Sequence, residues 1–110
     1  MATAEMKRGS TELLILSLLE ERSRHGYEIG KLIESRSAGA IAFSIPALYP
    51  TLCRMEDRGW LEAKWIEKPG TRRRRFYSLT TQGQQVLASQ RRDWQTFVAA
   101  VAQVAGLDHA

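Results

Sequence analysis

Four consecutive arginines, Arg72 to Arg75, form the longest run of like charges in the chain. Residues 64–75 hold six positive charges and one glutamate, so this segment carries 6 − 1 = +5, whereas the whole chain carries +4. Guanidinium groups bind phosphate oxygens through paired hydrogen bonds. A surplus of positive charge within one short segment indicates a binding site for a polyanion. A solvated turn would be the simpler explanation if the run stood alone.

The segment before the arginines predicts a helix that could enter a DNA groove. Ser44 is a good N-cap, and Pro46 falls in the tolerated first turn. The residues with helical spacing that we expect to face the core are Leu48, Leu52 and Met55. Those expected on another face are Ala47, Pro50, Thr51, Arg54 and Arg58. That face begins with small side chains and ends with arginines able to reach guanine edges or phosphates. An ordinary amphipathic helix has the same pattern.

The flanking segments predict an α+β fold that is mostly helical. A first helix beginning at Gly9 or Ser10 and a second beginning near Tyr27 precede the helix at Ser44. Two strands follow it, over residues 60–66 and 76–79, joined by a turn that contains Pro69 and Gly70. A short helix beside a basic hairpin is typical of a winged helix-turn-helix domain. We therefore expect a flexible segment over residues 1–9, a DNA-binding domain over 10–80 and a dimerisation helix over 81–106.

The last of these segments predicts one long helix from Thr81 to Ala105. Thr81 and Gln84 form a capping box at its start, and Gly106 ends it. Its apolar residues follow a seven-residue spacing, and a small domain has nowhere to bury so long a stripe. We therefore predict a homodimer whose two copies pack through this stripe. The expected interface residues are Leu87, Trp94, Phe97, Val98, Val101 and Val104.

Several classes of protein fit the sequence poorly. The chain of 110 residues has two histidines, His25 and His109, and one cysteine, Cys53, too few for a His-dependent triad or a His/Cys metal cluster. Cys53 lies among core positions and is better explained as a small apolar residue. No apolar run approaches the length of a membrane span. We therefore expect a cytoplasmic protein that is not an enzyme, has no metal site or cofactor and does not bind membranes.

Three segments of the chain resemble the PadR family of bacterial transcriptional regulators, and they occur in the family's order with nearly the family's spacing. The segments are HGYEIGKLIE from His25, SIPALYPTLCRMEDRG from Ser44 and GTRRRRFYSLTTQG from Gly70. The resemblance covers most of the chain. It implies a homodimeric winged-helix repressor of the short subfamily, with a single C-terminal helix, that binds an inverted repeat in a promoter.

The resemblance also implies roles for individual residues. Tyr27 would contact the DNA backbone, and the arginines of the hairpin would reach phosphates or the minor groove. The residues expected at the major groove are Ser44, Ala47, Tyr49, Pro50 and Arg54. A small phenolic or other flat hydrophobic effector would bind at the dimer interface beside Trp94 and Val98.

Some alternatives remain open at this point. Tyr49 is also explained as a core residue next to Leu48, and Trp94 as part of a closed dimer interface. Position 53 is commonly polar or basic in such proteins, so Cys53 removes one expected polar contact. The competing function is a winged-helix protein-protein interaction module without specific DNA binding, in which the arginines bind an acidic partner. The cationic side chains of Arg54 and Arg58 favour DNA.

Overall fold

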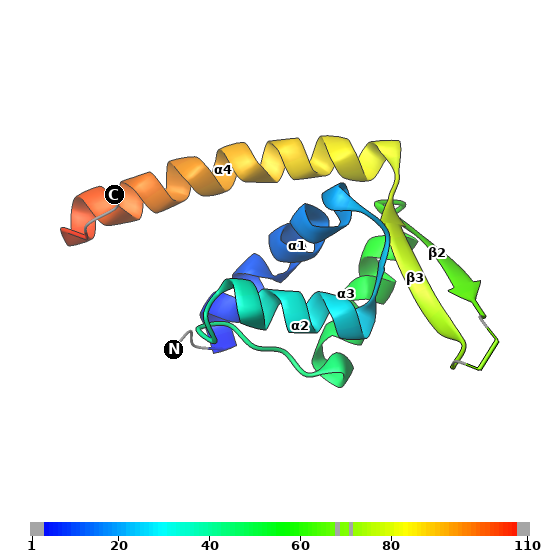
Figure 1. Cartoon of the computed structure of the whole chain (residues 1–110). Coiled ribbons are helices and arrows are strands. Elements are labelled where there is room, and N and C mark those ends of the chain that lie inside the picture. Colours follow the sequence, from blue (N-terminus) through cyan, green and yellow to red (C-terminus); the bar gives the residue numbers. More distant parts are fainter. Residues whose placement is uncertain (1–3, 68, 71, 108–110) are drawn as a thin grey trace.

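The computed structural model of the chain describes residues 4–67, 69–70 and 72–107, apart from the side chains of residues 4, 5, 7 and 8. Within these residues the elements are α1 (Ala4–Glu21), β1 (Arg24–His25), α2 (Gly26–Arg36), α3 (Ile45–Asp57), β2 (Leu61–Ile66), β3 (Arg74–Leu79) and α4 (Thr81–Ala105). Helices α1, α2 and α3 form the body of the molecule, and the β2–β3 hairpin, called the wing below, projects from one side (Figure 1). This arrangement confirms the predicted α+β winged-helix fold.

A single hydrophobic core joins the three helices to the wing and to the start of α4. Helix α1 contributes Ile15, Leu16, Leu18 and Leu19, and α3 contributes Leu48, Leu52 and Met55, as its spacing predicted. Helix α1 begins at Ala4, so the predicted start at Gly9 or Ser10 is wrong, and residues 4–9 are helical rather than a flexible segment. Ser10 does not cap the helix because its hydroxyl donates to the carbonyl oxygen of Met6 (3.0 Å) inside it.

The sheet is antiparallel with the strand order β1-β3-β2. The wing pairs residue 61 with 79 at its base and residue 66 with 74 toward its tip. Strand β1 was not predicted, because two residues are too few to show a periodicity. It pairs Arg24 with Tyr77 and His25 with Phe76, and so fixes the start of α2 beside the wing.

Helix α4 spans the predicted residues but begins with a different cap. The N-cap is Thr80, whose Oγ1 accepts from the backbone N–H of Gly83 (3.0 Å) and donates to the carbonyl oxygen of Gly59 (2.7 Å). The capping box predicted at Thr81 and Gln84 is therefore wrong by one residue. Gly106, in the left-handed region (φ 70°), ends the helix. Helix α4 crosses α1 and extends beyond the body of the molecule (Figure 1).

Candidate nucleic-acid interface

Helix α3 divides into a core face and an exposed face. Ser44 is its N-cap, as predicted, and its Oγ accepts from the backbone N–H of Ala47 (3.3 Å). The helix continues through Pro50, which points outward. The side chains exposed along the first two turns are Ser44, Ile45, Pro46, Ala47, Tyr49 and Pro50. Tyr49 is 50% exposed, so its alternative assignment to the core is wrong.

Thr51 does not belong to the exposed face. It is 7% exposed, because residues 48, 51, 52 and 55 form one stripe with spacings of three and four residues that faces the core. The side chain of Thr51 is therefore not exposed to DNA, and the prediction that it reads DNA is wrong. Its Oγ1 instead accepts from Nη2 of Arg54 (3.0 Å), which fixes the direction of an exposed guanidinium group.

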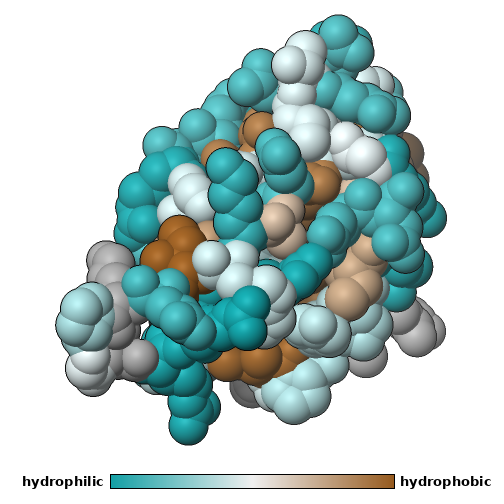
Figure 2. Space-filling view, turned by 90° about the vertical axis from the view of Figure 1, so that its right-hand side faces the viewer, coloured by the Kyte–Doolittle hydropathy of each residue, from teal (hydrophilic) through white to brown (hydrophobic). Residues whose placement is uncertain are grey.

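An open groove of about 410 Å³ separates α3 from the wing. Its walls include Tyr27 from α2, Ile45 and Tyr49 from α3, and Trp65 from β2, and Arg72 to Arg75 line its wing side. The groove therefore brings together Tyr27, Tyr49 and the wing arginines, which were predicted from three separate segments of the sequence. The other residues predicted at the major groove, Ser44, Ala47, Pro50 and Arg54, are exposed on α3 but do not line it. On this side of the molecule, hydrophobic patches lie among hydrophilic residues (Figure 2).

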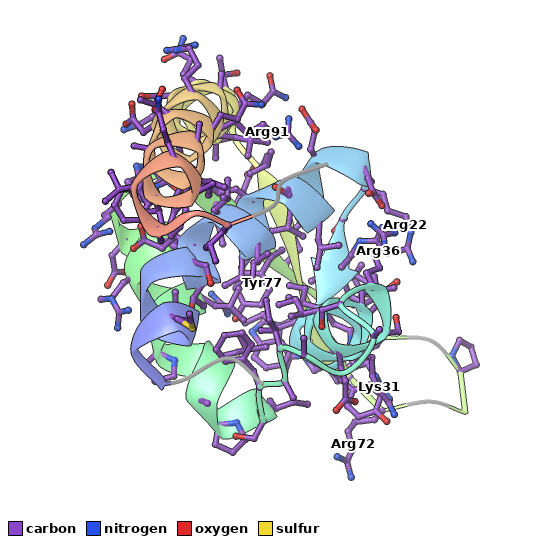
Figure 3. The ribbon with its side chains drawn as sticks, turned by 90° about the vertical axis from the view of Figure 1, so that its left-hand side faces the viewer. Arg22, Lys31, Arg36, Arg72, Tyr77 and Arg91 are labelled. Atoms are coloured by element: carbon purple, nitrogen blue, oxygen red, sulfur yellow. The ribbon has the colours of Figure 1, made fainter. Side chains whose placement is uncertain are left out.

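The four arginines of the wing have different environments. Arg72 is exposed and extends away from the wing, whereas Tyr77 of the adjoining strand lies in the interior (Figure 3). Arg73 lies over the ring of Trp65, with Cζ 4.6 Å from the ring centroid, and forms a long ion pair with Glu67 (3.7 Å). Nη1 of Arg74 lies 3.1 Å from Nε2 of His25. These three guanidinium groups remain accessible at the wing.

Arg75 is committed to contacts within the chain. Its Nη2 donates to both carboxylate oxygens of Glu56, at 2.9 and 2.7 Å, and its Cζ lies 5.6 Å from the ring centroid of Trp65. The bond to Glu56 raises the pKa of Arg75. Arg75 therefore ties the wing to the last turn of α3, and the prediction that it contacts DNA is not retained.

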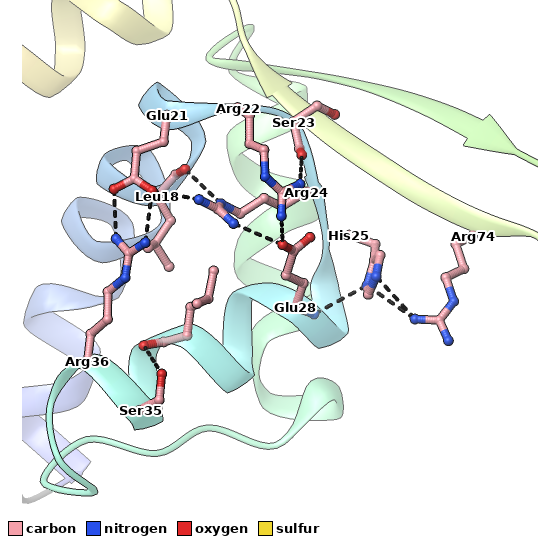
Figure 4. A network of polar contacts seen from close by, with 11 residues as sticks. Leu18, Glu21, Arg22, Ser23, Arg24, His25, Glu28, Ser35, Arg36 and Arg74 are labelled. Carbon is pink, nitrogen blue, oxygen red and sulfur yellow. Dashed lines mark hydrogen bonds and ion pairs between the residues drawn. The ribbon is translucent and has the colours of Figure 1, made fainter.

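A network of charged side chains surrounds the start of α2 (Figure 4). Tyr27 is the second residue of this helix. Arg24 is 5% exposed and donates to the carbonyl oxygen of Leu18 (3.0 Å), to Glu28 (2.9 Å) and to Glu21 (2.6 Å). His25 is the N-cap of α2, and its Nδ1 accepts from the backbone N–H of Glu28 (3.2 Å). Partial burial lowers the pKa of His25, and the positive charge of Arg74 lowers it further.

The stripe on α4 is divided between the core and the surface. Leu87 is 1% exposed and belongs to the core of its own chain, so its predicted place in a dimer interface is wrong. The first turns of α4 lie on that core, whereas most residues of the later turns are exposed, with Ala102 as a buried exception. The C-terminal end of α4 extends beyond α1 (Figure 1). The exposed fractions are 60% for Phe97, 51% for Val98, 39% for Val101 and 90% for Val104.

Trp94 lies on α4 between the buried residues Leu87 and Ala102. Its ring meets that of Phe97 edge to face, with 5.9 Å between centroids. Trp94 and Val98 also line an open cavity of about 510 Å³ between α4 and α1, together with Leu13 and Leu14. The two residues predicted to contact an effector are thus brought to one cavity.

The described residues give no sign of a membrane segment or a metal cluster. No helix within them is long and apolar enough to cross a bilayer. Among the same residues, no three His, Cys, Asp or Glu side chains gather as metal ligands would. His109 lies outside the part of the chain that the structure describes.

Comparison with known proteins assigns the chain to a family. The model of the PadR-like transcriptional regulators matches residues 15–89, which is more than half of the chain. The chain belongs to the PadR-like family. This family consists of transcriptional regulators, which confirms the prediction that the chain is not an enzyme. A relative from Lysinibacillus sphaericus, described as an uncharacterized protein, is 28% identical over 94 residues, 86% of each chain.

Solved structures of PadR-like and related regulators have the same fold. A transcriptional regulator from Clostridium thermocellum matches with a TM-score of 0.84 and 25% identity, over 94% of this chain and 97% of its own. A PadR family regulator from Clostridium difficile matches with a TM-score of 0.76 and 26% identity, over 88% and 99%. Bacillus subtilis PadR, solved in complex with operator DNA, has a TM-score of 0.67 and 22% identity, over 73% of this chain and 45% of its own.

Sequence reasoning missed Glu56, Trp65 as a support for arginines, and His25 as a cap. Tyr49, Cys53 and Glu56 recur at four and three residues along α3, a second stripe beside the core stripe. That stripe, followed by a hairpin rich in arginines, was the available signal for a link between α3 and the wing. The cap at His25 gave no comparable signal, because histidine is not a preferred N-cap residue.

Proposed function

We propose that this PadR-like regulator is a homodimeric repressor that acts in the cytoplasm and binds an inverted-repeat operator in a promoter. The observation that carries the proposal is the groove in which the exposed face of α3 and the wing arginines meet. A helix of this kind enters the major groove, while cations on the wing bind phosphate or enter the minor groove. The operator complex of Bacillus subtilis PadR supports DNA as the partner.

Each exposed residue then has a role. Arg54, held by Thr51, reaches base edges or phosphates, and Tyr27 contacts the DNA backbone from the start of α2. Ser44, Ala47, Tyr49 and Pro50 lie at the major groove. Arg72, Arg73 and Arg74 neutralise phosphates next to it. We retain residues 10–80 as the DNA-binding unit, with the addition that α1 begins before residue 10.

We further propose that the exposed part of α4 forms the dimer interface, and that residues 81–106 are the dimerisation helix. Phe97, Val98, Val101 and Val104 offer an apolar surface on α4 that the chain itself covers only in part. Burying a large apolar side chain stabilises a contact by about 1.5–3 kcal/mol. In two copies related by a two-fold axis, each of these residues would be buried in both copies. The same dimer would present two α3 helices to an inverted repeat.

The cavity beside Trp94 is the proposed effector site. Its volume of about 510 Å³ is within the range that accommodates a small aromatic molecule. Occupation of this cavity by a phenolic compound would change the packing of α4 on α1 and so the spacing of the two α3 helices. Titration with 4-hydroxybenzoate, followed by quenching of tryptophan fluorescence, tests this site. Quenching that persists unchanged in the Trp94→Phe variant would contradict it.

The test of DNA binding compares two variants on two duplexes. The protein is titrated against an operator duplex from its own upstream region and against a shuffled duplex of equal composition, at several salt concentrations. We expect the variant with Arg72 and Arg73 both replaced by alanine to lose affinity for both duplexes and to show a shallower salt dependence. We expect Arg54→Ala to lose more affinity for the operator than for the shuffled duplex. Equal losses on the two duplexes would contradict the role of Arg54.

A further inference from the structure

The exposed surface of the first two turns of α3 carries no charged side chain. Ile45 is 40% exposed and Tyr49 50%, and Pro46, Ala47 and Pro50 are exposed between and beside them. Ser44 uses its Oγ as the acceptor of the N-terminal cap. Arg54, one turn further along, is the first charged residue of the helix. The part of α3 that would enter a groove first is therefore almost entirely apolar.

This apolar surface limits which base pairs can lie against it. In the major groove, guanine, cytosine and adenine present hydrogen-bond donors and acceptors, whereas thymine also presents its C5-methyl group. An apolar side chain placed against a polar base edge would remove water without replacing its hydrogen bonds, which is unfavourable. An apolar side chain placed against the thymine methyl group buries two apolar surfaces together.

The surroundings of the same surface favour DNA over a protein partner. Ile45 and Tyr49 line the groove whose opposite side is formed by Arg72 to Arg75. Ile45 also borders a second, smaller hollow whose lining includes Tyr27, Lys31 and Glu34. The apolar surface thus lies directly beside the arginine-rich wing, as is expected where base edges lie next to a phosphate backbone.

We propose that the first two turns of α3 recognise thymine methyl groups, so that each operator half-site has A·T base pairs beneath Ile45 and Tyr49. This inference rests on the proposed function, because it specifies the chemistry of the DNA that the same surface binds. Arg54 remains for polar contacts at the other end of the half-site. The apolar residues then select for thymine, and the arginines of the wing supply affinity that does not depend on sequence.

The test uses duplexes that differ in methyl groups alone. High-affinity duplexes are first selected from a random pool by the full-length protein. Each thymine of one half-site is then replaced by deoxyuridine, which removes the C5-methyl group and leaves base pairing unchanged. We expect a loss of about fourfold in affinity for each contacted methyl group, the equivalent of one buried methylene. Replacing thymines outside the half-sites by deoxyuridine is expected to cause no loss of affinity.

A matched pair of variants assigns the effect to α3. In Ile45→Ala the ratio of affinities for the thymine and deoxyuridine duplexes is expected to fall toward one at a contacted position. In Arg72→Ala both affinities are expected to fall together, so that this ratio is unchanged. Selected half-sites without A·T pairs, or deoxyuridine duplexes that bind as tightly as the parent at every position, would overturn the inference while leaving the proposed function intact. A pool from which no sequence is enriched would contradict both.

Discussion

The contact between Glu56 and Arg75 joins α3 to the wing, and its removal has a calculable effect on stability. The guanidinium group donates to both carboxylate oxygens at 2.9 and 2.7 Å, and the side chains are 29% and 28% exposed. Hydrogen bonds between charged groups contribute about 1.5–3 kcal/mol when buried, whereas exposed ion pairs contribute about 0.2–1 kcal/mol. For this partly exposed pair we expect about 1 kcal/mol. Such a loss would lower Tm by about 4 °C in a domain of this size.

The assay is a double-mutant cycle with Glu56→Gln, Arg75→Gln and the combined variant, followed by urea denaturation at one fixed protein concentration. We expect a coupling energy of about 1 kcal/mol between the two sites. The control is the exposed pair of Arg91 and Glu20 (2.9 Å), whose side chains are 43% and 51% exposed, and for which we expect less than about 0.5 kcal/mol. If the changes in unfolding free energy of the two single variants sum to that of the double variant within about 0.3 kcal/mol, the link between α3 and the wing is refuted.

Three further predictions concern the cap of α2, the start of α4 and the dimer. Burial and the charge of Arg74 lower the pKa of His25 in the folded chain. As the pH falls, His25 is therefore protonated in the unfolded chain before it is protonated in the folded chain, and stability is expected to decrease below about pH 6.5. His25→Asn keeps a capping acceptor and is expected to lose this dependence in denaturation measured between pH 7 and 5.5. Gly83→Ala is expected to destabilise the fold by more than about 2 kcal/mol, since its Cβ would overlap the carbonyl oxygen of Trp60; an unchanged Tm would contradict the close approach. Phe97→Asp is expected to shift sedimentation from dimer to monomer, and an unchanged dimer would place the interface elsewhere.

The regular elements could be predicted because their signals are local. The spacing of Leu48, Leu52 and Met55 indicated the core face of α3, and Gly106 marked the end of α4. Thr51 was misplaced by the same kind of reasoning. Residues 51 and 52 lie three and four positions after Leu48, so both belong to the stripe that faces the core. Because threonine carries a hydroxyl group, its place at the edge of that stripe is hard to distinguish in the sequence from an exposed position.

The remaining errors concern contacts that only the tertiary structure creates. Arg75 and Glu56 are 19 residues apart in the chain, and nothing local distinguishes Arg75 from the three arginines before it. Leu87 fits the seven-residue pattern of α4, but the pattern does not say where the helix leaves its own core. The exposed part of the predicted stripe begins only beyond Trp94, with Phe97, although Ala102 further along α4 is buried.

The most direct test of the central claim is the affinity of the unmodified protein for specific and unspecific DNA. Fluorescence anisotropy is measured with a labelled duplex from the region upstream of its own gene and with a shuffled duplex of equal length, over a series of salt concentrations. We predict tighter binding to the first duplex at every salt concentration and a steep decrease in affinity for both duplexes as the salt concentration rises. Equal, weak binding to both duplexes, with little dependence on salt, would contradict this prediction.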